Sequence, residues 1–168
     1  MTIRPPRRVE LALLVEIERA AGRTYADHGM PEIAADDPGS AAELEPYRAA
    51  GAVWVAADAK DSPIAYILTA AIDAGLHIDQ VSVHPAHRGA RIGAALIDHV
   101  SGLAAASGRS AVTLTTFRDI PWNAPYYARL GFRELPEREW GPQLRALVAH
   151  EREAIPGDAP RVVMTRPV

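Results

Sequence analysis

The stretch VSVHPAHRGARIGAALIDHV, residues 81–100, constrains the fold of this chain more than any other segment. It begins as a β-branched strand, continues with two glycines and two arginines within six residues, and ends in a helical pattern. Ile92, Leu96, Val100 and Leu103 are predicted to form the buried stripe of that helix. The free amides at a helix start hold phosphate groups well. A capped helix with two solvated arginines fits the same residues, so the stretch alone leaves both interpretations open.

Two nucleotide-binding loops are excluded by spacing. A Walker loop needs Gly-Lys-Ser/Thr, and residues 93–95 read Gly-Ala-Ala. A dinucleotide fingerprint needs GxGxxG after a first strand, whereas Gly89 and Gly93 have GxxxG spacing in the middle of the chain.

Periodicity along the rest of the chain predicts strands that cluster early and then alternate with helices. In the helix 9–22, Val9, Leu13, Ile17 and Ala20 are predicted to be buried, with Gly22 as the C-cap. Residues 23–50 are broken by prolines and are expected to form one or two short helices and loops. The pattern indicates an α/β or α+β sheet with helices on both faces. The expected strands are 2–4, 52–58, 63–73, 76–85, 111–117, 132–139 and 161–167, and the further helices are 91–108, 124–131 and 141–153.

Composition excludes several function classes. The net charge of −3 over 168 residues does not favour nucleic acid or an anionic membrane. The absence of cysteine excludes disulfides, a thiolate zinc site and a cysteine nucleophile. The six histidines are scattered without metal-ligand spacing, so we expect no metal. Without an apolar leader at the N-terminus or an apolar run near ~20 residues, we expect a cytoplasmic protein with no membrane partner.

Several motifs in this order resemble the GCN5-related N-acetyltransferase (GNAT) superfamily: VSVHP, HRGARIGAALI, the strand AVTLTTF, NAPYYARLGF and the final RVVMTRP. The resemblance covers residues 50–168 well and residues 1–50 only in layout. It implies a mixed, mostly antiparallel seven-stranded sheet, splayed between strands 4 and 5, with acetyl-CoA in the splay. One domain, 1–168, is expected: 1–50 on the acceptor side, 51–135 as the acetyl-CoA-binding core, and 136–168 as an inserted helix and C-terminal strand.

The resemblance also implies a set of cofactor-binding residues. The family pattern Arg/Gln-x-x-Gly-x-Gly/Ala falls on residues 88–93, and Arg91 stands where the family has a glycine. Arg91 is therefore either a tolerated side chain or itself a phosphate contact. The implied cofactor contacts are Val81, Ser82, Val83, Arg88, Gly89, Ala90, Arg91, Ile92, Gly93, Ala94, Asn123 and Tyr127.

Tyr127 matches the tyrosine that the family places four residues before Gly131-Phe132, and it is the expected proton donor to the departing thiolate. A core aromatic is the competing interpretation, and the neighbouring Tyr126 is expected to point elsewhere. Asn123 suits a helix N-cap and a cofactor contact equally. A strand N–H near Val83 would stabilise the thioester oxygen.

The general base is left open between His77 and Asp79, which share one face of the strand 76–85 by period two. An imidazole titrates near neutral pH, and a carboxylate can relay a proton through water. A wet strand end for His77 and simple attraction of a cation by Asp79 are the competing interpretations. Glu18, His28 and Glu32 lie in the segment expected to line the acceptor site. His84, His87 and His99 are expected to be structural or solvated.

These features predict an acetyl-CoA-dependent N-acetyltransferase that acts on a small primary amine by direct transfer in a ternary complex. The acidic residues Asp27, Glu32, Asp36, Asp37, Glu43 and Glu45 would suit a cationic acceptor. A protein N-terminal or lysine acetyltransferase is one alternative, and it would need an open groove near Trp140. A CoA-binding sensor without turnover is the other. Family members are often dimers, so a homodimer is allowed.

Overall fold

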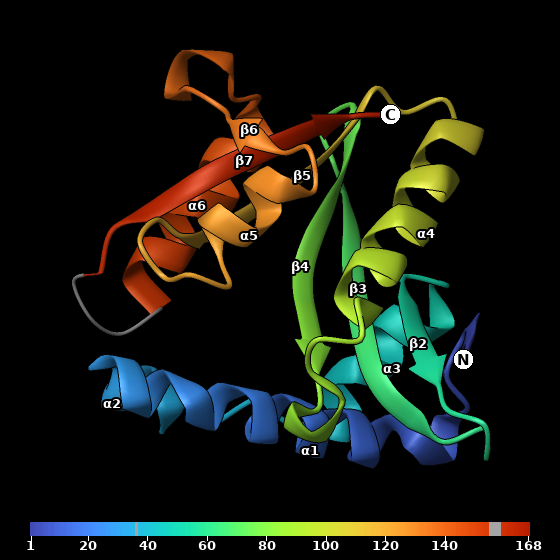
Figure 1. Ribbon diagram of the computed structural model, residues 1–168. Coiled ribbons are helices and arrows are strands. Elements are labelled where there is room, and N and C mark those ends of the chain that lie inside the picture. The colour runs from blue at the N-terminus through green and yellow to red at the C-terminus, as the bar shows by residue number, and fades with distance from the viewer. Residues whose placement is uncertain (36, 155–158) are drawn as a thin grey trace. The chain divides into compact units, whose positions relative to one another are not determined.

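A computed structural model describes residues 1–35, 37–154 and 159–168. Seven strands form one mixed sheet, as the resemblance of the sequence motifs implied, and their order is β1-β2-β3-β4-β5-β7-β6 (Figure 1). β4 and β5 pair in parallel, while β1 with β2, β2 with β3, β5 with β7 and β6 with β7 pair antiparallel. The strands are β1 (Thr2–Arg4), β2 (Val53–Ala57), β3 (Pro63–Ile72), β4 (Gly75–Val83), β5 (Ala111–Phe117), β6 (Arg133–Glu134) and β7 (Arg161–Pro167).

The helices fall near the predicted ranges. They are α1 (Leu11–Gly22), α2 (Pro31–Ala34), α3 (Ala41–Ala49), α4 (Ile92–Ala106), α5 (Ala124–Arg129) and α6 (Pro142–Ala154), with 3-10 turns η1 (Arg8–Glu10), η2 (Arg23–His28), η3 (Pro85–His87) and η4 (Glu137–Glu139). The strand predicted at 132–139 is wrong beyond its first residues. Arg133 and Glu134 pair with β7, and the Leu135 N–H still donates to the Val163 carbonyl at 2.8 Å. Pro136 then leads into η4, because proline has no N–H for a strand ladder.

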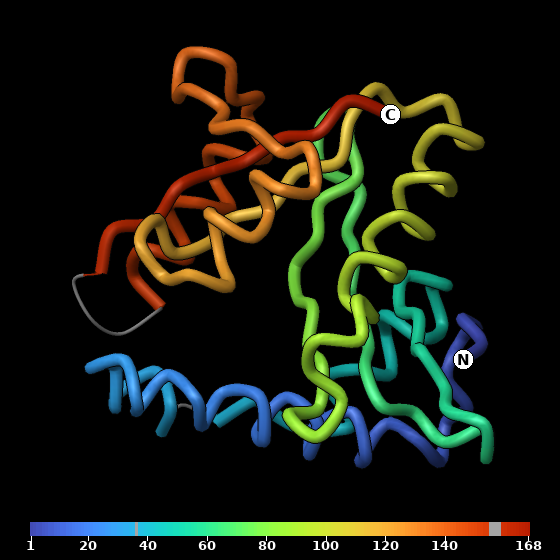
Figure 2. The backbone as a smooth tube through the Cα atoms, viewed as in Figure 1, coloured from blue at the N-terminus to red at the C-terminus, as the bar shows by residue number. Residues whose placement is uncertain are grey.

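The described chain divides into two compact units. The first comprises Met1–Thr69 and Asp79–Val100, and the second comprises Ala70–Ile78 and Ser101–Val168. The hairpin β3–β4 runs through both, as the continuous green trace in Figure 2 shows. These boundaries differ from residues 50 and 135, and the single-domain organisation expected from the sequence stays a prediction.

The core of the first unit lies between α1, α3 and the strands β2 and β3. Leu11, Leu14 and Ile17 of α1 pack with Val55 and Tyr66. Of the predicted stripe, Ile17 is buried and Ala20 is half-buried, but Val9 is 87% exposed and Leu13 39%, so the predicted buried side is wrong at these two positions. Apolar residues surround this helix on several sides, so periodicity alone did not select the side that faces the sheet.

The end of α1 also differs from the expectation. Gly22 keeps a right-handed helical conformation, and the chain continues into η2. Gly29, with φ of +75°, adopts the left-handed conformation that ends this segment. In α4, Ile92, Leu96 and Val100 are buried as predicted, but Leu103 is 37% exposed and Ala104 is buried instead.

In the second unit, helices cover the two faces of the β5–β7 pair. Val112, Leu114 and Thr116 of β5 lie opposite Arg166, Met164 and Val162 of β7, and Arg166 contacts α5 by donating to the Leu130 carbonyl. Residues directly opposite in antiparallel strands share a face. Thr115 and Val163 therefore lie on the other face, where Val163 packs against Leu144 and Val148 of α6 (Figure 1).

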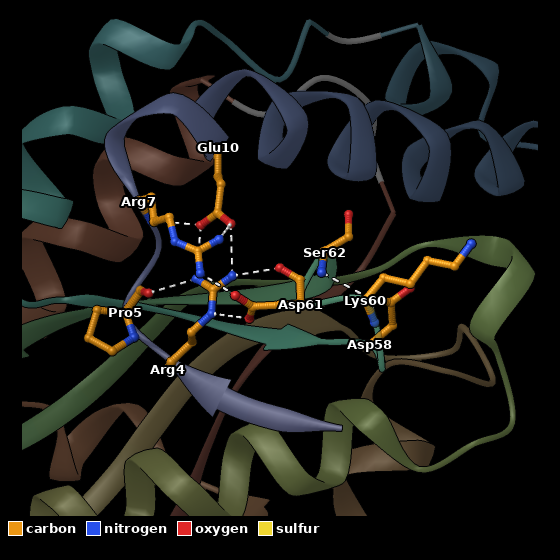
Figure 3. A network of polar contacts seen from close by, with 8 residues as sticks. All are labelled: Arg4, Pro5, Arg7, Glu10, Asp58, Lys60, Asp61 and Ser62. Atoms are coloured by element: carbon orange, nitrogen blue, oxygen red, sulfur yellow. Dashed lines mark hydrogen bonds and ion pairs between the residues drawn. The ribbon is translucent and has the colours of Figure 1, made fainter.

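The N-terminal strand is tied to the β2–β3 turn by a charged network (Figure 3). Arg4 donates to the Glu10 carboxylate at 2.7 Å and to Asp61 at 2.8 Å, and Arg7 also contacts both acids. Glu10 is only 8% exposed. The hydrogen bond from Arg4 lowers the pKa of the Glu10 carboxyl, which therefore stays charged despite its burial.

Candidate functional site

The predicted site residues divide between the two units. The phosphate-loop residues and the end of β4 belong to the first unit, whereas His77, Asn123 and Tyr127 belong to the second. Each half has its own geometry.

The turn before α4 resembles an anion-binding loop in two respects, its backbone conformation and its position at a helix start. Gly89 has φ of +81° and Arg91 has φ of +58°, so both adopt the left-handed conformation. Arg91 thus takes the backbone angles that a glycine would take at the same position. α4 follows for 15 residues, and its first intrahelical bond runs from the Ala95 N–H to the Arg91 carbonyl. The amides of residues 92–94 therefore lie at the helix start, where the dipole favours an anion.

The side chains of this loop differ in exposure. Arg88, Gly89, Ala90 and Arg91 are exposed, whereas Ile92, Gly93 and Ala94 are buried. Arg88 donates to Thr24 Oγ1 at 2.8 Å, which ties the loop to η2. Thr24 was not predicted, and nothing in its sequence context marks it as a loop contact.

The end of β4 carries a buried polar cluster in the first unit. Ser82 is 3% exposed, accepts a hydrogen bond from Gln80 at 2.8 Å, and bonds to the Tyr66 hydroxyl. Tyr66 is fully buried and donates to the Glu18 carboxylate of α1. Burial, followed by the Glu18 charge, raises the pKa of the Tyr66 hydroxyl, which therefore stays protonated. The two neighbours of Ser82, Val81 and Val83, are half-buried.

Asp79 lies on the side of β4 that faces α3. It accepts a hydrogen bond from the Tyr47 hydroxyl, and burial together with the Asp79 charge raises the pKa of that hydroxyl. Tyr47 and Tyr66 both pack in the α1–α3 core. The sequence carried no signal for the contacts of Tyr47 and Tyr66.

Tyr127 and Asn123 come together at the start of α5. The Asn123 carbonyl accepts from the Tyr127 N–H at 2.9 Å, and Asn123 is 6% exposed. Its side chain makes no capping hydrogen bond, so Asn123 occupies the N-cap position through its backbone alone. Tyr127 is 9% exposed and packs edge-on against Phe132. Tyr126 is less buried, with the Arg129 guanidinium over its ring.

His77 is buried in the second unit, with 1% of its surface exposed. Its Nδ1 lies 2.9 Å from Thr113 Oγ1, on the face of β5 that α6 covers. Burial lowers the pKa of the His77 imidazole to about 4. At neutral pH the ring is therefore uncharged.

The other named candidates lie away from these clusters or at their edge. His28 and Glu32 are exposed, and His28 Nδ1 lies 3.2 Å from the Thr24 carbonyl. His99 packs edge-on against Trp54 at 4.5 Å, and His84 against His87 at 6.1 Å. Asp36 lies outside the described residues. Within residues 1–35, 37–154 and 159–168, no three histidine or acidic side chains gather as metal ligands, and no helix is long and apolar enough to cross a membrane.

Comparison with known proteins identifies the family of this fold. The family model "Acetyltransferase (GNAT) domain" matches residues 49–134, which include β4, the Gly89–Arg91 turn and Tyr127. The chain belongs to the GNAT acetyltransferase family. Its sheet order and its parallel β4–β5 pair are those of a GNAT enzyme, in agreement with the resemblance of the sequence motifs.

Solved GNAT structures match over the whole chain. Rv2747 from Mycobacterium tuberculosis, in complex with CoA, is 17% identical with a TM-score of 0.73, covering 100% of this chain and 99% of its own. The PaiA N-acetyltransferase from Thermoplasma acidophilum, in complex with coenzyme A, is 15% identical with a TM-score of 0.72, covering 99% and 98%. The ribosomal-protein-S18-alanine N-acetyltransferase from Escherichia coli is 17% identical with a TM-score of 0.68, covering 99% and 93%. At these identities the likeness concerns the fold.

Proposed function

We propose that this GNAT protein transfers the acetyl group of acetyl-CoA to a primary amine of a small molecule, directly within a ternary complex. The observation that carries the proposal is the turn with Gly89 and Arg91 both left-handed ahead of α4. This turn leaves the amides of residues 92–94 and two exposed arginines for the pyrophosphate of CoA. CoA-bound Rv2747 and PaiA, which share the fold, support the same cosubstrate.

The remaining predicted cofactor contacts belong to the same proposal. Val81, Ser82 and Val83 would hold the pantetheine arm through the backbone, and an N–H near Val83 would stabilise the thioester oxygen. Asn123 would contact the cofactor from the start of α5.

Asp79 is our choice for the general base. An alkylammonium has a pKa near ~10, so the acceptor must lose a proton before attack. The His77 imidazole is 1% exposed and its Nδ1 bonds to Thr113 Oγ1, so an acceptor amine has little access to this ring. The Asp79 carboxylate is half-buried and held by the Tyr47 hydroxyl, which suits it to attract an ammonium and to accept its proton through water.

Tyr127 is our choice for the general acid. A tyrosine hydroxyl is a hydrogen-bond and proton donor, so Tyr127 can donate to the thiolate that leaves the acetyl group. The backbone bond from the Tyr127 N–H to Asn123 and the contact with Phe132 hold the ring in one orientation.

The test follows the release of free CoA thiol with acetyl-CoA and a panel of small amines and peptides. We expect release with small amines, and Tyr127→Phe is expected to lower kcat by 10²-fold or more, as for a lost general acid. Tyr126→Phe is the matched control, because it removes the neighbouring hydroxyl, and it should keep kcat. Equal activity of Tyr127→Phe and the unchanged protein at every pH would refute the acid role.

The same assay separates the alternatives. Asp79→Asn should remove most of the activity at pH 7, and His77→Gln should remove less; the reverse order would make His77 the base. Release only with peptides would favour a protein acetyltransferase, of the kind represented by the ribosomal-protein-S18-alanine enzyme. Tight CoA binding without release for any amine would favour a sensor. A cytoplasmic location and a homodimer belong to the proposal too, and light scattering in solution tests the dimer.

A further inference from the structure

Arg166, near the end of β7, connects three separate elements of the second unit. Its Nη1 donates to the Leu130 carbonyl, at the end of α5, at 3.0 Å, and its Nη2 donates to the Ser101 hydroxyl of α4. Its guanidinium lies 5.3 Å from the centre of the Phe132 ring. Arg166 and these three residues all belong to the second unit. The arginine therefore ties the chain at the end of α5 to β7 and to α4.

A guanidinium suits the end of a helix. The last four carbonyls of a helix have no partner within it, and a positive charge is favoured there. Leu130 is the C-cap of α5, and a planar guanidinium can donate to its carbonyl and to a second oxygen at once. Arg166 therefore fixes the last turn of α5.

The stem of Arg166 lies close to the backbone that follows α5. Gly131 has φ of +87°, a left-handed conformation that turns the chain out of the helix. A Cβ on Gly131 would lie 3.6 Å from Arg166 Cδ, which is an ordinary van der Waals distance. The stem therefore packs against the side of Gly131 to which a side chain would point.

The residues that Arg166 contacts in turn hold Tyr127. The Tyr127 carbonyl accepts from the Leu130 N–H at 2.9 Å and from the Phe132 N–H at 3.1 Å. The rings of Tyr127 and Phe132 meet edge to face, with their centres 5.8 Å apart. Tyr127 is therefore fixed by its backbone and by its ring, and both sets of contacts lead to Arg166.

A second arginine of this region offers a comparison. The Arg129 guanidinium lies 5.8 Å from the centre of the Tyr126 ring, and Arg129 is exposed. Arg166 is half-buried, and Phe132 is only 4% exposed. A contact between a cation and an aromatic ring is stronger when it is shielded from water. Arg166 is therefore better placed than Arg129 to fix the orientation of an aromatic ring.

We infer that Arg166 is a positioning residue for the general acid: it orients Tyr127 through Leu130 and Phe132, so that the Tyr127 hydroxyl stays aimed at the sulfur of the departing CoA. In this role Arg166 touches neither substrate nor cofactor. The inference rests on the proposed function, because it names the residue that orients the proton donor of the same reaction. A displaced donor lowers the rate of the chemical step and leaves the binding of acetyl-CoA intact, since small displacements of catalytic groups cost large factors in rate.

A double-mutant cycle on Arg166 and Tyr127 tests this role. Arg166→Met keeps a long apolar stem and removes the guanidinium. In the thiol-release assay it is expected to lower kcat ~10-fold, while KM for acetyl-CoA changes less than ~2-fold. In the Tyr127→Phe background the same substitution should change kcat less than ~2-fold, because no hydroxyl is left to orient. An arginine that only stabilises the fold would lower kcat by the same factor in both backgrounds, and equal factors would overturn the inference.

Two further variants complete the cycle. Arg166→Lys keeps the positive charge and one donor, so it should lower kcat less than Arg166→Met. If Arg166→Met does not fold, as judged by circular dichroism, Arg166→Lys takes its place in the cycle and the same dependence on the Tyr127 hydroxyl is expected. Arg129→Met is the matched control, because it removes an exposed guanidinium over the neighbouring Tyr126 ring, and it should keep kcat. A loss of kcat in Arg129→Met as large as that in Arg166→Met would overturn the inference.

Failure of the proposed function is distinguishable from failure of this inference. If no amine releases thiol, or if Tyr127→Phe keeps kcat, the acid role fails, and fluorine NMR of the protein labelled with fluorotyrosine tests the orientation of Tyr127 directly. The Tyr127 resonance is assigned by its loss in Tyr127→Phe. A shift or broadening of this resonance in Arg166→Met that exceeds the change in Arg129→Met supports Arg166 as the residue that positions Tyr127. An unchanged resonance in Arg166→Met, or an equal change in both variants, overturns it.

Discussion

Arg91 has a backbone conformation that favours glycine, and it keeps an exposed guanidinium in the loop that we assign to CoA. A left-handed conformation costs an L-residue roughly 1–2 kcal/mol. A contact between the Arg91 guanidinium and the pyrophosphate of CoA would explain why an arginine stands at this position despite the cost.

Two substitutions distinguish the effect of the backbone conformation at residue 91 from the effect of its side-chain charge. Arg91→Ala and Arg91→Gly both remove the guanidinium, and each is expected to raise KM for acetyl-CoA about tenfold with little change in kcat. Arg91→Gly should be more stable than Arg91→Ala by about 1 kcal/mol, measured by urea unfolding, because only glycine accepts φ of +58° freely. An unchanged KM in both variants would make Arg91 a bystander.

At the scale of elements, α6 begins on a residue that is far away in the sequence. The Asp73 carboxylate, from the β3–β4 turn, accepts from the backbone N–H groups of Gln143 and Leu144 at 3.1 Å each. The Gln143 side chain accepts in return from the Asp73 N–H. A Cβ on Gly141 would lie 2.3 Å from this carboxylate, so the approach requires glycine.

Removal of this cap should destabilise the protein. Asp73→Ala is expected to cost about 1 kcal/mol, as for a lost N-cap, read from the shift of the urea midpoint. Asp73→Asn keeps one acceptor oxygen and should lose less. If Asp73→Ala and Asp73→Asn unfold at the midpoint of the unchanged protein, the cap has no measurable role in stability.

At the scale of the whole molecule, stability should fall in two stages on acidification. Burial keeps the pKa of His77 at about 4, below the ordinary ~6.5, so the unfolded chain binds the proton first. The stability due to neutral His77 is complete above pH ~6.5 and is lost as the pH falls towards 4. The carboxylates of Glu10 and Asp61, with pKa values lowered by arginine, add a second loss below the ordinary range near pH ~4.

Denaturant midpoints measured from pH 7.5 to pH 3 check this profile. His77→Gln should flatten the stage between pH 6.5 and 4, because glutamine does not titrate. Glu10→Gln should instead reduce the loss below pH ~4.5, and at pH 7 it should cost about 1–2 kcal/mol for the weakened bonds to Arg4. An unchanged slope above pH 4.5 in His77→Gln would contradict the first stage.

Short stretches of the sequence are sufficient to predict features that depend on near neighbours. The strand and helix periods and the turn before α4 follow from neighbours within a few residues. The ordered motifs of residues 81–132, together with the final RVVMTRP, were enough to indicate the GNAT family, because their chemistry depends on spacing along the chain.

Features that depend on residues distant in the sequence are visible only in the folded structure. The buried side of α1, the 1% exposure of His77, the Tyr47–Asp79 bond and the Asp73 cap on α6 each join segments tens of residues apart. Burial and hydrogen-bond partners are set by these long-range contacts, and they shift the pKa values of the groups concerned.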